Sequence, residues 1–293
     1  MTLRNLFIVL YSFLLLIFLS VAFPFPATAQ DAHSKLEVCQ TAELEAFRTT
    51  VGNYDNSIGF VGVDAPKGIY TGVGFKVAED LILTAAHVVA EDGILPMKIA
   101  KNIRFFPKMT LTERAIFFGV KEASEEAGVT LKIEVVKIGR PLTVNDDWAI
   151  LRVSSKSKTG QAFEDFKRAP VVPILPWSSR TKKIRAYGFP QGCEDQEIFQ
   201  LASFTGETRP LSFSLGSSEK FSAYLKGAND IIKFDNALDG YEMEGMSGGP
   251  VFVVDPNTGT PLYCVGVLSK GGHQAYFATS AIFLKEIYSI LPH

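Results

Sequence analysis

Short runs rich in β-branched and aromatic residues recur from Ile58 to the C-terminus, with glycine- and proline-containing turns between them. Such runs favour β-strands, and many short strands at close spacing predict an all-β barrel or sandwich. Few stretches have the periodicity of a long helix. The expected strands cover residues 58–63, 71–77, 81–84, 103–106, 115–120, 131–138, 148–153, 171–174, 183–187, 198–204, 222–225, 250–254, 262–268 and 276–278.

Two more polar segments, 111–129 and 156–167, interrupt this pattern, and we expect surface loops or insertions there. Residues 34–51 space their apolar side chains loosely as a helix does, which predicts a short N-terminal helix on the outside of the core. Residues 280–291 predict an amphipathic C-terminal helix with Ser280 as its N-cap. The apolar face of that helix would consist of Phe283, Ile287 and Ile290.

The first 29 residues have the composition of an export signal. Arg4 supplies a positive start, residues 6–23 are almost wholly apolar, and Ala27-Thr28-Ala29 is a small-x-small cleavage site. An uncleaved membrane anchor is the alternative, because the apolar stretch approaches the roughly 20 residues that span a bilayer. Two prolines after that stretch favour cleavage. We therefore expect a secreted or periplasmic protein that begins at Gln30 and has no stable association with the membrane.

The remaining chain is long enough for one large all-β unit or a pair of packed barrels. The formal net charge of the full chain, −2, gives no reason to expect nucleic acid as a partner, and we expect a monomer. The three cysteines, Cys39, Cys193 and Cys264, allow at most one disulfide. Cys193 and Cys264 could pair, although the sequence does not fix the connectivity. Our expectation is unpaired structural thiols.

One run carries the strongest chemical signal: Gly245-Met246-Ser247-Gly248-Gly249-Pro250-Val251. A serine hydroxyl is a weak nucleophile at neutral pH and needs a neighbouring base. Glycines around it allow backbone conformations that present the hydroxyl and aim successive N–H groups at one point. The alternative is an ordinary β-turn without chemistry.

Two upstream segments supply a base and an acid. His87 lies near the end of the apolar run 81–89, after two small alanines, and Asp147 directly precedes the apolar segment 148–151. The chain order is therefore histidine, aspartate, serine, an order that differs from those of the α/β-hydrolases and the subtilisins. A structural histidine and an ordinary turn acid are the alternatives, and Asp146 competes with Asp147.

Together, Thr84-Ala85-Ala86-His87, Asp147-Trp148-Ala149-Ile150-Leu151 and the Gly-x-Ser-Gly-Gly-Pro run at Ser247 resemble the trypsin/chymotrypsin-like serine protease family, from about Ile58 to the C-terminus. The resemblance implies an all-β fold of two packed six-stranded antiparallel β-barrels with a C-terminal helix. The implied organisation is a signal peptide at 1–29, an N-terminal extension with a short helix at 30–57, a first barrel at 58–155 and a second at 170–293.

The resemblance also implies the roles of the site residues. His87 would be the general base, Asp147 would orient it, and Ser247 would be the nucleophile. The N–H groups of Gly245 and Ser247 would form the oxyanion hole. The implied activity is that of a serine endopeptidase, with a polypeptide substrate and neither metal nor cofactor.

Substrate recognition is less defined. Ser269, Lys270 and Gly271 resemble the segment that pairs a substrate backbone as an added β-strand. The primary specificity pocket would be walled by residues 241–244, 270–272 and 275–277. Glu242 or Glu244 would favour a basic side chain if it faced inward, and a solvated loop acid is the alternative for each. Tyr187-Gly188-Phe189-Pro190 resembles a turn of bacterial glutamyl endopeptidase-like members, and His273 lies off-register with their pocket histidine.

The sequence departs from the family pattern at Met246. Many members have an aspartate there, which pairs with a newly cut N-terminus during activation. An apolar side chain cannot accept that ion pair, so we expect no zymogen activation of this kind. A catalytically silent protease-like binding or regulatory module is the alternative function. A metal-dependent hydrolase is disfavoured, because no cluster with ligand spacing occurs.

Overall fold

The computed structural model describes residues 52–65, 68–90, 98–100, 102–107, 131–139, 143–154, 160–178, 182–189, 202–210, 230–234, 245–270 and 276–291. All of them belong to one compact unit, Cys39–His293. The predicted signal at 1–29 and the helix at 34–51 lie outside the described residues, as do Cys39, Cys193 and the expected strands 115–120 and 222–225. A 3-10 helix, η1 (Gly52–Ser57), leads into the first strand.

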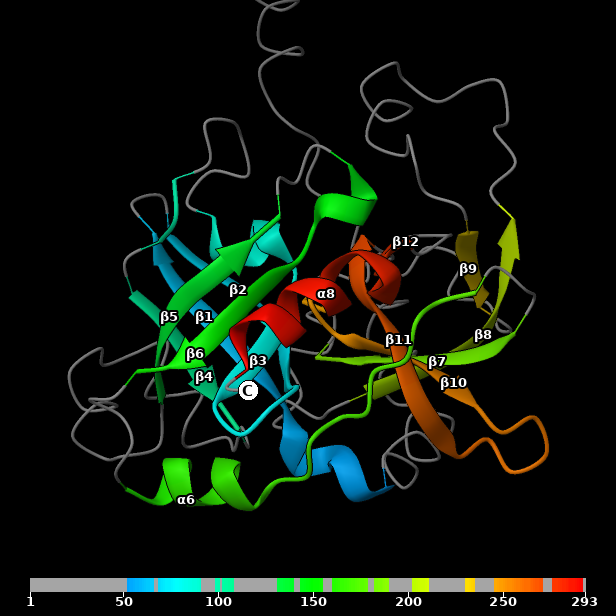
Figure 1. Cartoon of the computed structure of the whole chain (residues 1–293), viewed down its shortest axis with the longest axis horizontal. Helices are drawn as coiled ribbons and strands as arrows, with labels where there is room; N and C mark the ends of the chain where they lie inside the picture. Colours follow the sequence, from blue (N-terminus) through cyan, green and yellow to red (C-terminus); the bar gives the residue numbers. More distant parts are fainter. Residues whose placement is uncertain are drawn as a thin grey trace, which may run out of the picture. The chain divides into compact units, whose positions relative to one another are not determined.

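Six antiparallel strands close into a barrel in the order β1-β2-β3-β6-β5-β4. Their apolar side chains fill it: Phe60, Phe75 and Phe105 are fully buried. The strands, in blue to green in Figure 1, are β1 (Ile58–Ala65), β2 (Gly68–Lys76), β3 (Leu81–Thr84), β4 (Asn102–Phe106), β5 (Leu131–Ile138) and β6 (Ala149–Val153).

The second half is a six-stranded antiparallel sheet in the order β12-β11-β10-β7-β8-β9. It curls so that Cα atoms of its edge strands β9 and β12 approach within 8 Å, although no ladder joins them within the described residues. The predicted chymotrypsin-like fold is therefore confirmed, with a closed first barrel and a half-barrel as the second. The strands are β7 (Lys183–Gly188), β8 (Ala202–Pro210), β9 (Asp230–Phe234), β10 (Pro250–Val254), β11 (Pro261–Lys270) and β12 (Tyr276–Thr279).

One hydrophobic core spans the junction of the two halves. Phe60 of the barrel meets Phe189 edge to face, with ring centroids 6.1 Å apart. Tyr187 and Phe252 of the second sheet form a similar pair at 5.4 Å and join the same buried cluster. Aromatic pairs of this geometry add to the stabilisation from buried area. The barrel and the sheet are thus held together by packing near the site described below.

The connecting segment corrects two sequence predictions. Residues 156–167 are not only loop, because α6 (Gln161–Arg168) forms there. Most residues of α6 are polar, but Ala162 and Phe166, four residues apart, lie on one face of the helix and are buried. The expected strand at 171–174 reduces to a single parallel bridge between Ile174 and Cys264.

A buried lysine ties α6 to the barrel. The Lys76 ammonium of β2 donates to the carbonyls of Phe166, Lys167 and Ala169 at 2.9, 3.0 and 2.8 Å. These carbonyls lie at the C-terminal end of the helix, where they lack intrahelical partners and where positive charge is favourable. Lys76 therefore caps a helix 90 residues away and fixes the path of the connection.

The C-terminal helix is confirmed as α8 (Ser280–Ile290), shown in red in Figure 1. Phe283 and Ile287 are buried as predicted, and Ile290 is partly buried. The N-cap position belongs to Thr279, so the prediction for Ser280 is wrong by one residue. The Ser280 hydroxyl instead donates to the carbonyl of Leu175 at 2.6 Å, because the connecting segment passes close by.

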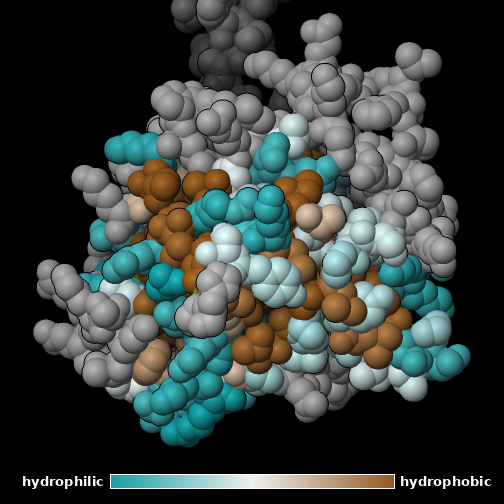
Figure 2. Space-filling model, in the orientation of Figure 1, coloured by the Kyte–Doolittle hydropathy of each residue, from teal (hydrophilic) through white to brown (hydrophobic). Residues whose placement is uncertain are grey.

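On the outer side of α8, Glu286 forms an ion pair with Lys137 of β5. Figure 2 shows hydrophilic and hydrophobic residues intermixed over this face. Exposed apolar side chains on these two elements are Val136, Ile282 and Tyr288. Within the part of the chain that the structure describes, no helix is both long and apolar enough to cross a bilayer.

Cys264 of β11 is a buried free thiol, and its Sγ donates to the Gly266 carbonyl at 3.2 Å. Burial raises the pKa of this thiol to about 12. A thiol that stays protonated is unreactive at neutral pH. Cys264 therefore behaves as a small core side chain, in line with the expectation of an unpaired structural thiol.

Candidate active site

The histidine of the site follows the end of β3. β3 ends at Thr84, the backbone stays extended at Ala85, and the 3-10 helix η2 (Ala86–Val89) carries His87. Ala85 and Ala86, which precede the histidine, are fully buried. The His87 side chain keeps 31% of its surface exposed, which leaves one side of the imidazole open to solvent.

Asp147 meets His87 through two hydrogen bonds. It follows the 3-10 helix η3 (Val144–Asp146), and its carboxylate is fully buried. Its Oδ1 accepts the His87 backbone N–H at 2.9 Å, and its Oδ2 accepts the Nδ1 proton at 2.7 Å. An ionised carboxylate only accepts, so the proton of a neutral imidazole lies on Nδ1 and Nε2 is left basic.

A third hydrogen bond holds the same carboxylate, because the Ser269 hydroxyl donates to Asp147 Oδ2. Burial by itself would raise the pKa of Asp147. The charge of His87 and the hydrogen bonds from His87 and Ser269 outweigh that cost, so the pKa of Asp147 lies below its ordinary value of 3.8. The buried acid is therefore ionised at neutral pH.

Asp146 lies elsewhere. Its Oδ2 accepts the hydroxyl proton of Thr143 at 2.8 Å, a contact within the η3 turn. Of the two adjacent acids that the sequence offered, the structure brings Asp147 to His87.

The serine turn depends on two glycines with positive φ. Gly245 has φ of 84° and Gly248 has φ of 89°, values that residues with a Cβ rarely adopt. Within the turn, the Gly249 N–H donates to the Met246 carbonyl at 3.0 Å, and the Gly248 N–H donates to the Leu268 carbonyl at 2.7 Å. The turn is therefore fixed both internally and to β11.

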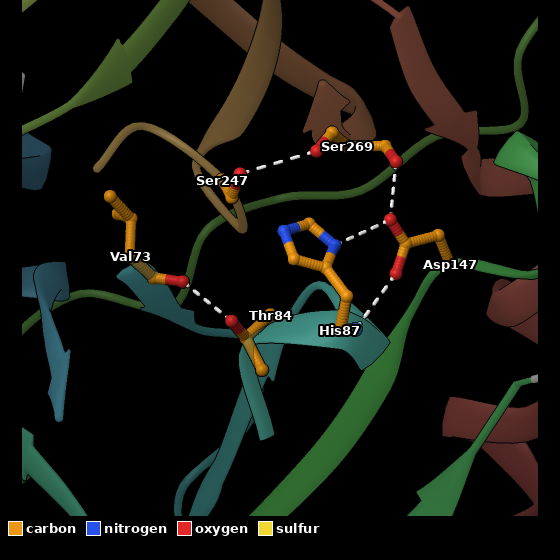
Figure 3. Close-up of polar contacts among 6 residues, drawn as sticks. All are labelled: Val73, Thr84, His87, Asp147, Ser247 and Ser269. Atoms are coloured by element: carbon orange, nitrogen blue, oxygen red, sulfur yellow. Dashed lines mark hydrogen bonds and ion pairs between the residues drawn. The ribbon is translucent and has the colours of Figure 1, made fainter. Parts of the chain in front are cut away.

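Ser247 lies on the far side of the His87 ring from Asp147 (Figure 3). Its side chain is half-buried, and its hydroxyl donates to the Ser269 carbonyl at 3.2 Å. The structure thus brings the three predicted residues into one place, with Ser247 in a rotamer directed at Ser269. Ser269 contacts the site twice, through its hydroxyl to Asp147 and through its carbonyl to Ser247.

Met246 is fully buried next to this serine. It belongs to a cluster of apolar side chains from the second sheet that includes Ile184, Leu268 and Phe277. The packing is close, since a Cβ on Gly188 would lie 2.9 Å from the Met246 Cα atom. An apolar cluster therefore surrounds the position where many family members have their activation aspartate.

The predicted substrate-binding residues are only partly described. Ser269 is buried in β11, and Lys270, the last residue of that strand, pairs with Tyr276 of β12. Gly271, residues 241–244 and His273 lie outside the described residues. The expected pocket residues Tyr276 and Phe277 are buried, and burial raises the pKa of Tyr276.

Sequence reasoning missed two contributors to this site. It proposed Ser269 only for its backbone, whereas its hydroxyl also holds Asp147. Thr84 was part of a motif but had no role, whereas its hydroxyl donates to the carbonyl of Val73 beside the serine turn. The one hint in the sequence is that each is a small hydroxyl residue near the end of an apolar strand, which does not identify the acceptor. Within the described residues, no group of three or more His, Cys, Asp or Glu side chains could hold a metal ion.

Comparison with known proteins agrees with this geometry. The model of the trypsin-like peptidase domain matches residues 72–267, which is most of the chain and includes all three segments of the site. The chain belongs to the trypsin-like peptidase family. It is thereby a serine endopeptidase, as the sequence predicted. A search of curated protein sequences found no match to this chain.

Solved structures support the fold. A thermostable serine protease from an extremophilic microorganism is 18% identical, with a TM-score of 0.56 over 80% of this chain and 97% of that one. The protease Anisep from Arthrobacter nicotinovorans is 15% identical, with a TM-score of 0.54 over 80% and 94%. A Glu endopeptidase in complex with MPD is 15% identical, with a TM-score of 0.50 over 82% and 95%. At sequence identities this low, the similarity to these structures supports the fold of the trypsin-like peptidase and nothing beyond it.

Proposed function

We propose that this trypsin-like peptidase hydrolyses peptide bonds through a triad of His87, Asp147 and Ser247. The observation that carries the proposal is the pair of hydrogen bonds from His87 to the buried Asp147. They fix the ring and its tautomer, and they leave Nε2 on the side where Ser247 lies.

In the proposed reaction, the Ser247 hydroxyl first turns from the Ser269 carbonyl toward His87. His87 Nε2 takes its proton while Oγ forms a bond to the carbonyl carbon of the scissile peptide. The electron pair of the C=O bond moves to its oxygen. Asp147 stabilises the imidazolium that forms, and it keeps its own negative charge.

The N–H groups of Gly245 and Ser247 would receive the developing oxyanion, each contributing about 3 kcal/mol to transition-state stabilisation. The tetrahedral intermediate then collapses. The C–N bond breaks, the amine takes the proton from His87, and an ester remains on Ser247. Water attacks this ester with His87 again as base, which releases the acid and restores the serine. No step requires a metal or a cofactor.

We further propose that substrate binds as a strand along Ser269, Lys270 and Gly271. Ser269 and Lys270 end β11, where the register with β12 shifts between Leu268 and Lys270. An extended peptide can add to the end of such a strand through backbone hydrogen bonds. The carbonyl of Ser269 would accept an N–H of the substrate backbone in place of the Ser247 hydroxyl.

A fluorophosphonate probe tests the proposed function, because it reacts with activated serines. We expect the folded wild-type protein to be labelled, the Ser247→Ala variant to remain unlabelled, and a chelator to have no effect. Ser154→Ala is a matched control, since the Ser154 hydroxyl donates to Glu134 in the first barrel. A well-folded wild-type protein without labelling would contradict the proposal and favour a silent binding module.

We also propose that the protein is exported and that its signal is removed. The supporting observation is the order of Arg4, the apolar stretch 6–23 and the Ala27-Thr28-Ala29 site. Expression in a bacterium with a periplasm is expected to give a protein that begins at Gln30 in the periplasmic fraction. N-terminal sequencing measures this directly. A membrane-bound protein that retains residues 1–29 would instead show an anchor.

A further inference from the structure

The first barrel holds the serine turn through strand β2. The Val73 N–H donates to the carbonyl of Ser247 at 2.7 Å, which joins the two halves of the fold at the proposed nucleophile. The approach is close on both sides. A Cβ on Gly72 would lie 2.8 Å from the Ser247 carbonyl oxygen, and one on Gly248 would collide with the carbonyl of Val73. The turn therefore rests directly on the backbone of β2.

Val73 lies just past the end of a ladder. Strands β2 and β3 pair from Lys76 and Ile82 to Gly74 and Thr84. The N–H and C=O of a strand residue point toward the same neighbouring strand. The N–H and C=O of Val73 therefore have no residue of β3 opposite them. Because buried peptide groups need hydrogen-bond partners, they must bond to other groups.

Each of these two groups has one partner of its own. The N–H binds Ser247, and the carbonyl accepts the hydroxyl proton of Thr84 at 2.6 Å (Figure 3). Thr84 is fully buried, and it ends β3 three residues before His87 in η2. The Thr84 hydroxyl is thus bonded to Val73, and Val73 is bonded to the carbonyl of Ser247.

We propose that Thr84 is a positioning residue, whose hydroxyl fixes Val73 and through it the nucleophile Ser247. This inference rests on the proposed function, because it assigns a role relative to that nucleophile. Thr84 touches neither substrate nor reacting atoms. Its effect is to couple the strand end that carries His87 to the turn that carries Ser247, across the junction of the two halves.

Removing the hydroxyl while keeping the shape isolates this effect. In a Thr84→Val variant, the carbonyl of Val73 stays buried without its donor, and we expect the β2 backbone at Val73 to shift toward another partner. Ser247 moves with it. Because a misplacement of about 1 Å costs on the order of 100-fold in rate, we expect kcat to fall about 10- to 100-fold while KM changes little.

The experiment measures kcat, KM, the rate constant of fluorophosphonate labelling and the melting temperature for wild type, Thr84→Val and Thr84→Ser. The serine variant keeps a donor, so we expect its kcat and labelling rate to be close to those of wild type. Thr208→Val is the matched control. Thr208 is also a fully buried threonine with a bonded hydroxyl, but it lies in β8 and contacts Lys182. This control is expected to lose stability without losing kcat.

Wild-type kcat in a folded Thr84→Val variant would overturn the inference. A loss of kcat no larger than that of Thr208→Val would do so as well. If Thr84→Val does not fold, Thr84→Cys replaces it in the experiment. Because a thiol is a weaker hydrogen-bond donor than a hydroxyl, we expect the kcat of this variant to be lower than that of Thr84→Ser. Wild-type kcat in the cysteine variant would again be contrary. Labelling of wild type, lost in Ser247→Ala, keeps the proposed function intact in each of these cases.

Discussion

Replacing Ser247 by alanine is expected to lower kcat about a million-fold, because the triad acts as a unit and no other group supplies the acyl acceptor. The fold should be unaffected. The substitution removes the 3.2 Å hydrogen bond from the serine hydroxyl to the Ser269 carbonyl, whereas the backbone hydrogen bonds of the turn remain. Steady-state hydrolysis of a chromogenic peptide, selected by cleavage of a peptide library with the wild-type enzyme, measures kcat and KM.

Residual activity about a thousand-fold or more above the uncatalysed rate would still be consistent, because oxyanion stabilisation and substrate binding persist without the nucleophile. The Ser154→Ala variant, used above as the labelling control, should retain wild-type kcat. If Ser247→Ala kept more than a small fraction of wild-type activity at an unchanged melting temperature, the nucleophile would have to be another residue.

The second large effect concerns the acid. Asp147→Asn is expected to lower kcat on the order of 10⁴-fold at neutral pH, since an amide that donates to His87 Nδ1 forces the ring proton onto Nε2. The Nε2 atom that faces Ser247 then carries a proton and cannot accept the one from the serine hydroxyl. Asp146→Asn is the matched control, because its carboxylate contacts Thr143 and not His87. Equal losses in the two variants would contradict the assignment of Asp147.

The same variant has a signature in the pH dependence of stability. The folded-state pKa of Asp147 lies below its ordinary value of 3.8. Its ionised form therefore stabilises the fold above pH 3.8, and this contribution is lost as the pH falls below 3.8 toward the folded-state pKa. Urea unfolding between pH 7 and 3 should show a steeper loss of unfolding free energy for wild type than for Asp147→Asn. Parallel curves would be the contrary result.

Much of the fold could be predicted from the sequence, because alternating short apolar runs and turns leave few architectures open. The prediction failed where local composition misleads. The segment that contains α6 is polar along most of its length, and its helix depends on one buried face and on Lys76, which is distant in sequence. The N-cap of α8 was misplaced by one residue because Thr279 and Ser280 are both suitable capping residues by type.

The site shows the same limit. The order of His87, Asp147 and Ser247 along the chain was enough to nominate them, because each stands in a distinctive local motif. The roles of the Ser269 and Thr84 hydroxyls were not recognised, since the acceptor of a hydroxyl depends on which group lies opposite in space: the Asp147 carboxylate for Ser269 and the Val73 carbonyl for Thr84. That information is contained in strand register and in the docking of the two halves, and neither is encoded in a short window of sequence.

Met246 gives the serine turn an apolar contact that does not depend on dissolved salt. Burial of a methionine side chain stabilises by about 1.5–3 kcal/mol, and this contribution arises from contact and dehydration. An ion pair at that position would weaken as dissolved salt screens the charges. The buried thioether in its apolar cluster carries no charge to screen. The packing of Met246 beside Ser247 is therefore expected to hold equally well at low and high ionic strength.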